Sequence, residues 1–402
     1  MQINLNKLKH ACVMLLLFFM AMNFKAKFFY FVFFTLFMVM IMRFRNFHFP
    51  DVAFVYAGLS IIMALYNYSE GLLSMVRCVS PLAMYLVGYN YVDTKKRENL
   101  DCDSWLKETE NAGNKMLLMI ALGSFAHYMA NFFLNSGSVI GRNTIDIWSG
   151  QRMAATGQGA LACVMLGLAV SMLFLPLLPR YRIYGLACIM GILFYNMILA
   201  GRTLIIVLII LLIFASWYSD HALKKQRNRR IKLWVTILLG IVVLGLVLAF
   251  DIGGNVLFSG SSNFYQRFRG LQDILETSGR MRVKLYYLKD ALRYPFGGCH
   301  MQNRYSYAHD LLLDAYDEYG IVVFALLIAI LILTTKRMYV FVKRTKFSEE
   351  IKLAYLCVLI SIMLYFCVEP ILVGMPWLFS CYCLFGGYLA SATKFHSNYE
   401  WM

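Results

Sequence analysis

The chain has 402 residues, of which 60% are hydrophobic and 15% charged, and its mean hydropathy is +0.62. One soluble core could not bury that much apolar sequence, so the composition excludes an ordinary soluble domain and indicates a polytopic membrane protein. In a soluble protein the formal net charge of +16 would suggest a nucleic-acid partner. Here most basic residues lie in short loops between apolar segments, as the positive-inside bias requires, so no nucleic acid is expected as a partner.

Twelve apolar segments are candidate membrane spans, because a helix satisfies its own backbone hydrogen bonds in lipid. Basic runs at 224–232 and 343–344 fall on the same side as the N-terminus, which predicts cytoplasmic termini and one all-α membrane domain, 1–402. Phe24-Lys25-Ala26-Lys27 and a second span follow the first segment, so we expect an uncleaved anchor. The segments are 11–23, 28–42, 52–66, 72–92, 116–135, 161–178, 185–200, 203–218, 233–250, 319–335, 353–368 and 371–392.

Two polar insertions face outward in this topology, at 136–160 and 251–318. In the second, apolar residues at positions 281, 285, 288 and 292 predict an amphipathic helix from Gly279 to Arg293, with a basic opposite face, lying at the outer membrane surface. Pro295-Phe296-Gly297-Gly298 should end that helix, because proline lacks the N–H and glycine permits a sharp turn.

Basic residues exceed acidic ones in the outward loop 251–308, against the topological bias. Guanidinium groups bind phosphate oxygens two at a time, so this excess indicates an anionic partner such as a phosphate or pyrophosphate. The alternative is contact with lipid headgroups. The basic residues are Arg267, Arg269, Arg280, Arg282, Lys284, Lys289, Arg293 and Arg304.

Arg202 lies between two apolar runs with almost no loop around it. This places it at the outer interface, facing the bundle or reaching lipid headgroups. A tight turn between two helices needs no charge, so we expect a functional role. Arg77, inside the fourth segment, is explained at least as well by a structural ion pair.

His309 is the residue best suited to acid–base chemistry. An acidic stripe follows it on a predicted helix, formed by Asp310, Asp314, Asp317 and Glu318. Asp310 can cap this helix, and the positive helix end disfavours a charged imidazole, leaving the neutral form that a general base needs. Spacing alone favours the simpler interpretation, an interfacial histidine without chemistry.

His127, in a span, and His300, in the loop, are candidates for supporting groups. The ten cysteines are scattered, with no C-x-x-C pair. Neither disulfides nor a zinc site is therefore predicted.

Several sequence elements occur in a fixed order: Gly279-Arg280, the amphipathic stretch, Pro295-Phe296-Gly297-Gly298, Ala308-His309-x-x-Leu312 and Tyr319-Gly320-Ile321. Together they resemble the bacterial O-antigen polymerase and O-antigen ligase superfamily. Gly201-Arg202-Thr203 and Arg152-x-x-x-x-Gly157 resemble further elements of that family, and the resemblance covers 152–335. Asp310 stands where the ligases usually have Asn, Ser or Gln, and Val323 where a small or polar residue is expected, which favours a polymerase.

The resemblance implies a GT-C-like membrane helix bundle and a metal-independent, inverting glycosyl transfer. The donor would be a glycan on undecaprenyl pyrophosphate, and the acceptor a sugar hydroxyl of another lipid-linked unit. His309 would accept the hydroxyl proton, while Arg202 and Arg280 would hold the departing pyrophosphate. No cofactor is expected, since no Asp-x-Asp-type motif stands on the outward side. The secondary site residues are Arg152, Arg282, Asp310 and Tyr316.

The leading hypothesis is therefore a polysaccharide polymerase of the inner membrane, extending O-antigen or capsule repeats at a periplasmic active site. Its partners would be the lipid-linked donor and acceptor, the bilayer and, as a further candidate, a chain-length regulator. The same chemistry would serve a ligase that moves the glycan to lipid A core or to protein. A lipid-linked oligosaccharide transporter or flippase is the alternative from another class, although the charged mid-membrane residues and related halves of transporters are not visible.

Overall fold

The computed structural model describes residues 5–24, 35, 38, 48–91, 102–135, 143–175, 179–222, 279–298 and 306–397. Most of these residues are helical, which confirms the predicted helical architecture for this part of the chain. Five of the described helices are long and apolar enough to cross a membrane, as a membrane protein requires. They are α6 (Cys102–Leu134), α7 (Ala155–Phe174), α8 (Pro179–Ile198), α9 (Arg202–Ala222) and α15 (Ile321–Arg344).

Other predicted spans also coincide with helices. The predicted span 233–250 and the loop segment 251–278 lie outside the described residues, as does 28–42 except for residues 35 and 38. The further helices are α1 (Leu5–Ala21), α3 (Ala53–Tyr66), the 3₁₀ turn η1 (Tyr68–Glu70), α4 (Leu72–Tyr91), α13 (Gly279–Arg293), α14 (Leu311–Tyr319), α16 (Glu349–Phe366), α17 (Ile371–Gly374) and α18 (Pro376–Ser397).

Two helices differ from the predicted spans. α6 has 33 residues, so it includes part of the expected cytoplasmic loop 93–115. At 1.5 Å per residue it is roughly 50 Å long, well beyond the hydrocarbon core. The expected span 371–392 is broken between α17 and α18. Pro376 explains the break, because proline disfavours the helical region for Met375, whose φ is −142°.

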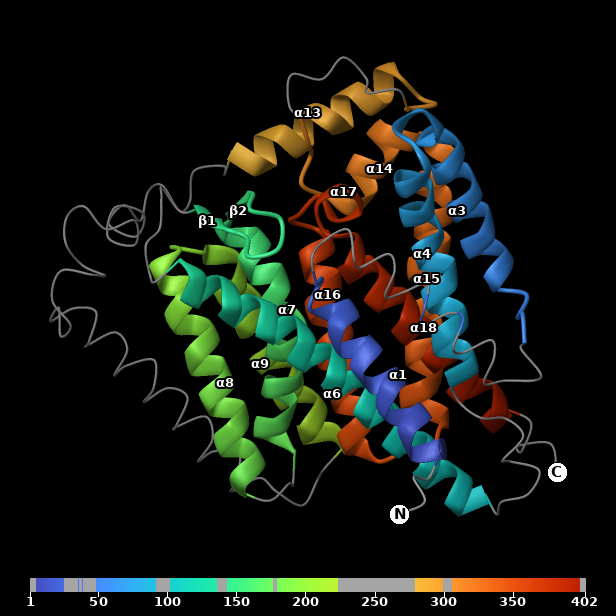
Figure 1. The fold of residues 1–402 in the computed structure, drawn as a ribbon, viewed down its shortest axis with the longest axis vertical. Coiled ribbons are helices and arrows are strands. Elements are labelled where there is room, and N and C mark those ends of the chain that lie inside the picture. The colour runs from blue at the N-terminus through green and yellow to red at the C-terminus, as the bar shows by residue number, and fades with distance from the viewer. Residues whose placement is uncertain are drawn as a thin grey trace, which may run out of the picture. The chain divides into compact units, whose positions relative to one another are not determined.

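The chain divides into two compact units. In the first unit α4 packs along α18, α3 packs on α4 and α15, and α14 packs on α15 (Figure 1). Gly88 and Gly387 allow α4 and α18 to approach closely, because a Cβ at either would overlap the backbone of the other helix. The first unit comprises Met1–Ala126, Arg282–Lys352 and Phe366–Met402; the second comprises His127–Met281 and Leu353–Tyr365.

In the second unit the buried helix α7 packs on α8 and α9. A short hairpin, β1 (Asn143–Ile145) and β2 (Arg152–Ala154), pairs antiparallel with Thr144 opposite Met153 and leads directly into α7 (Figure 1). The hairpin lies in the insertion predicted at 136–160, where no strand was expected.

Candidate functional site

His309 lies in the first unit, directly before α14, and its backbone is left-handed, with φ of 57°. Non-glycine residues rarely adopt this region, although His does so more readily than branched residues. Asp310 is the N-cap of α14: its carboxylate accepts from the N–H groups of Leu312 (3.1 Å) and Leu313 (3.3 Å). The predicted cap is thus confirmed, and His309 is positioned at the N-terminus of a helix.

A second carboxylate, that of Asp314, binds the backbone on both sides of His309. Its Oδ1 accepts from the N–H of Ala308 at 2.6 Å, and its Oδ2 accepts from the N–H of Asp310 at 3.0 Å. The side chain is buried, with 6% of the residue exposed. Burial raises the pKa of Asp314 to about 7, and the charges of Asp310 and Asp317 add to that effect, against the lowering effect of the two N–H groups.

Lys284, on α13, forms an ion pair with the cap residue. Its Nζ lies 2.9 Å from Oδ2 of Asp310, and it also donates to the carbonyl oxygen of Cys367. Lys284 was predicted only as part of the basic excess. Its position provides a positive charge to balance the carboxylate that follows His309.

The amphipathic helix predicted at 279–293 is confirmed as α13, with one difference. Its apolar stripe is exposed, as expected for a helix at a membrane surface: Met281 is 51% exposed and Leu288 is 50% exposed. The opposite face is not basic, because it carries the buried Tyr287 and Asp290. The exposed basic residues flank the apolar stripe; they include Arg282, Lys289 and Arg293.

The turn after α13 joins two of the sequence elements that carry the resemblance, because the N–H of Ile321 donates to the carbonyl of Phe296 at 2.8 Å. Gly297 (φ 61°) and Gly298 (φ 80°) reverse the chain, and the N–H of Gly298 donates to the carbonyl of Tyr316 at 3.0 Å. A Cβ at Gly297 would overlap that carbonyl. The hydroxyl of Tyr316 donates to the carbonyl of Tyr294 at 2.5 Å. Tyr316, predicted as a secondary site residue, therefore braces the end of α13 against α14.

Arg202 lies in the second unit, half-buried at the first residue of α9. The turn before it is tight: Ala200 has φ of 52°, and the side-chain amide of Asn196 donates to the carbonyl of Gly201 at 2.6 Å. A Cβ at Gly201 would overlap the side-chain amide of Asn196, so a larger residue there would displace this amide from its contact. A guanidinium at a helix N-terminus combines two groups that attract anions.

Arg280 is also in the second unit, in the first turn of α13. Its Nη2 donates to the hydroxyl of Thr156 at 2.9 Å. Thr156 lies in the first turn of α7, within the Arg152-x-x-x-x-Gly157 element, so two elements of the resemblance meet in this unit. Arg152 itself is exposed on β2. The meeting of these arginines with His309 stays a prediction.

Sequence reasoning missed a buried polar network in the second unit. Nε2 of His127 lies 2.6 Å from Oδ1 of Asp146, and both side chains are buried. Asp146 also accepts from the N–H (2.9 Å) and hydroxyl (2.8 Å) of Ser149. Burial alone would raise the pKa of Asp146, but His127 and Ser149 outweigh it and hold that pKa below its usual value. The sequence does carry one indication of this network: polar residues recur every four positions and so share one face of a helix, at His127, Asn131 and Asn135.

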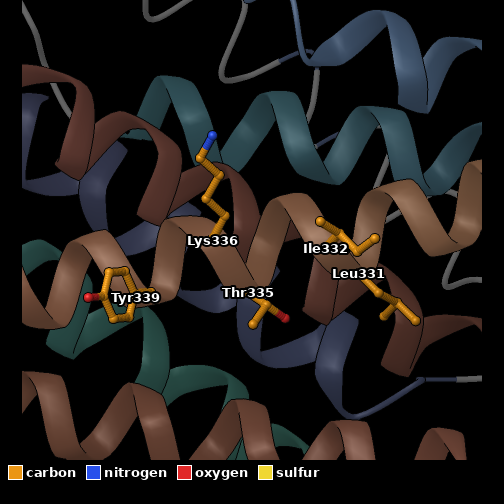
Figure 2. A pocket seen from close by; sticks show the side chains of 5 residues that line it. All are labelled: Leu331, Ile332, Thr335, Lys336 and Tyr339. Atoms are coloured by element: carbon orange, nitrogen blue, oxygen red, sulfur yellow. The ribbon is translucent and has the colours of Figure 1, made fainter.

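Two further features are a cation bound to a backbone carbonyl and a surface depression. Arg77 donates to the carbonyl of Leu372 at 2.6 Å, so it ties α4 to α17 through a backbone contact. A surface depression is lined by α15 residues alone (Figure 2). It begins ten residues beyond Ile321, roughly 15 Å along the axis of α15 from the first residue of that helix. Its lining residues are Leu331, Ile332, Thr335, Lys336 and Tyr339.

Among the described residues, no three His, Cys, Asp or Glu side chains are grouped so as to hold a metal ion. Comparison with known proteins does not identify the chain: no protein-family model matches it, and no curated protein matches it either. The family resemblance therefore depends on the sequence elements themselves, several of which the structure explains physically.

Proposed function

We propose that the chain is a membrane-embedded glycosyltransferase that polymerises oligosaccharide repeats of O-antigen or capsule carried on undecaprenyl pyrophosphate. It would cross the bacterial inner membrane twelve times, with cytoplasmic termini and a periplasmic active site. The observation that supports this most is the position of His309: a strained histidine at a capped helix start, with the flanking N–H groups held by a buried carboxylate. Strain of this kind is typical of functional sites.

In the proposed reaction the acceptor sugar hydroxyl attacks the anomeric carbon of the donor. His309 takes the hydroxyl proton as the new C–O bond forms. The bond from the anomeric carbon to the pyrophosphate oxygen breaks, and the pyrophosphate leaves with the electron pair. Arg202 and Arg280 stabilise its charge with their guanidinium groups, and the configuration at the anomeric carbon inverts. No redox or metal step is needed for this balance.

The secondary residues have supporting roles in this proposal. Asp310 caps α14 and pairs with Lys284, which fixes the start of the helix beside His309. Tyr316 holds the preceding turn in place. Arg152 and Arg282 are exposed and suited to contact the anionic lipid carrier or headgroups.

A ligase would use the same chemistry with a different acceptor, and Asp310 in place of the usual ligase residue favours the polymerase. A flippase would leave the constrained His309 without a role. The distinguishing experiment follows lipid-linked repeats in a deletion strain. Single repeats attached to core support a polymerase, whereas long unattached polymer would identify a ligase, and repeats retained on the cytoplasmic leaflet would identify a flippase.

A further inference from the structure

We propose that Asp314 is a positioning residue for His309: its carboxylate holds the backbone on both sides of the histidine and so keeps His309 in its left-handed conformation. The proposal deepens the proposed function, because it names the residue that aims the base. In sequence, Asp314 is one of several acidic residues on a helix, and nothing in that pattern separates it from Asp317.

The geometry supporting this is a carboxylate that bridges two amides. Oδ1 accepts from Ala308 and Oδ2 from Asp310, at 2.6 and 3.0 Å, so each oxygen binds the N–H of one neighbour of His309. N–H groups two residues apart converge on one anion when a residue between them is left-handed. The φ of 57° at His309 meets that condition.

The location of Asp314 makes this bridge strong. The residue is 6% exposed, and Ala308 is fully buried, so water does not compete well for the N–H of Ala308. Asp314 is also in the first turn of α14, where a carboxylate is stabilised by the helix N-terminus. One side chain thus joins the helix start to the turn that carries His309.

The positioning role follows from the cost of the left-handed region. Only glycine occupies it freely, so a histidine stays there when surrounding contacts require it. Without Asp314 the two amides lose their shared acceptor, and the backbone at 309 can relax to a right-handed or extended conformation. That change would redirect the imidazole while leaving the helix bundle in place.

The first test uses stability and does not depend on enzymatic activity. His309→Gly and His309→Ala are compared by thermal unfolding of the full-length chain in detergent, each with Asp314 and with Asp314→Asn, at a pH above 7 so that Asp314 is ionised and both of its oxygens accept. Both variants lack the imidazole, so their difference reports on the backbone conformation. At a left-handed position glycine is the more stable residue; elsewhere alanine is favoured, because glycine loses more entropy on folding.

With Asp314 present, we expect His309→Gly to melt above His309→Ala, by about 1–2 °C. In the Asp314→Asn background the order should vanish or reverse, since asparagine offers one acceptor oxygen instead of two. The same Gly-over-Ala difference in both backgrounds would overturn the proposal. So would the absence of any difference with Asp314 present, because position 309 would then not be left-handed.

The second test measures polymer formation by Asp314→Asn with purified lipid-linked repeats. We expect the kcat to fall by roughly tenfold or more, with little change in KM, because a misdirected base slows the chemical step and not binding. Asp290→Asn is the matched control: Asp290 is similarly buried in the same unit, and its carboxylate lies 3.7 Å from the guanidinium of Arg293. A wild-type kcat in Asp314→Asn, or an equal fall in both variants, would contradict the positioning role. Activity of His309→Ala tests the proposed function separately.

Discussion

Two buried carboxylates, Asp146 and Asp314, organise tight turns in the two units but have opposite electrostatic surroundings. Each accepts backbone N–H groups from the turn it holds. Asp146 also has His127 at 2.6 Å, and its pKa is lowered. Asp314 has acidic neighbours, and burial raises its pKa to about 7. A buried carboxylate whose charge is stabilised by a neighbouring histidine, as in Asp146, is suited to a structural role. A buried carboxylate that titrates near neutrality, as in Asp314, is typical of a functional site.

The largest effect on stability should come from breaking the buried pair of His127 and Asp146. We expect His127→Ala to destabilise the protein by about 3–5 kcal/mol, because Asp146 would remain charged and buried without its partner. Thermal unfolding and size-exclusion chromatography of the variant in detergent measure this. Replacing both residues, His127→Leu with Asp146→Asn, should recover part of the loss. An unchanged melting temperature in His127→Ala would show that the pair contributes little.

Removing the pyrophosphate-binding arginines should affect activity more than stability. We expect Arg280→Ala and Arg202→Ala each to lower the rate of donor use by roughly a hundredfold, since each removes a cation at the departing charge. Arg→Lys at either position should restore activity only in part, because an ammonium group cannot bind two oxygens as a guanidinium does. The readout is polymer formed from a labelled lipid-linked donor. Full activity of Arg202→Ala would show that Arg202 does not bind the pyrophosphate and only anchors the chain at the membrane interface.

The pH dependence of stability should distinguish the two carboxylates. Asp314 has a folded pKa above its unfolded value, so its stabilising contribution is complete below about pH 4 and is lost as pH rises through about 7. The slope is at most about 1.4 kcal/mol per pH unit. Asp146 has a lowered pKa, so its contribution is present above pH 4 and is lost only below it.

Between pH 5 and 7 the melting temperature of the wild type should therefore fall as Asp314 loses its proton, since burial and the nearby carboxylates of Asp310 and Asp317 disfavour its ionised form. Lys284 lies near through its pair with Asp310. Asp314→Asn should flatten this slope. A slope that survives in Asp314→Asn would assign the titration to another group.

The smallest effect should come from the partly exposed ion pair. Lys284→Ala removes the partner of Asp310, whose side chain is 19% exposed, and leaves its two bonds to the helix N–H groups. We expect a loss of about 1 kcal/mol, measured by thermal unfolding, with polymer still formed. A loss as large as that of His127→Ala would mean that Lys284 is also needed to hold the cap.

The features predicted correctly from sequence are those that depend on local patterns. The apolar periodicity of 279–293 predicts α13, and the acidic residue Asp310 predicts the helix cap. Pro295 and the two glycines that follow Phe296 predict the turn. These follow from helix geometry and side-chain chemistry within a few residues.

The features that were missed depend on tertiary contacts. Asp146 lies 19 residues from His127, and no local pattern indicates that pair. Asp314 is close to His309 in sequence, but its choice of Ala308 and Asp310 as partners depends on a left-handed backbone that sequence does not reveal. The polar first part of α6 has low hydropathy, which predicts a loop, whereas the helix continues through it from Cys102.

The most direct test of the proposed chemistry is polymer formation by His309→Ala in a strain lacking the wild-type chain, with membrane insertion and expression checked in parallel. We expect the variant to insert normally and to leave single repeats on the acceptor, because no other group replaces the base. A normal ladder of chain lengths from this variant would contradict the catalytic role of His309.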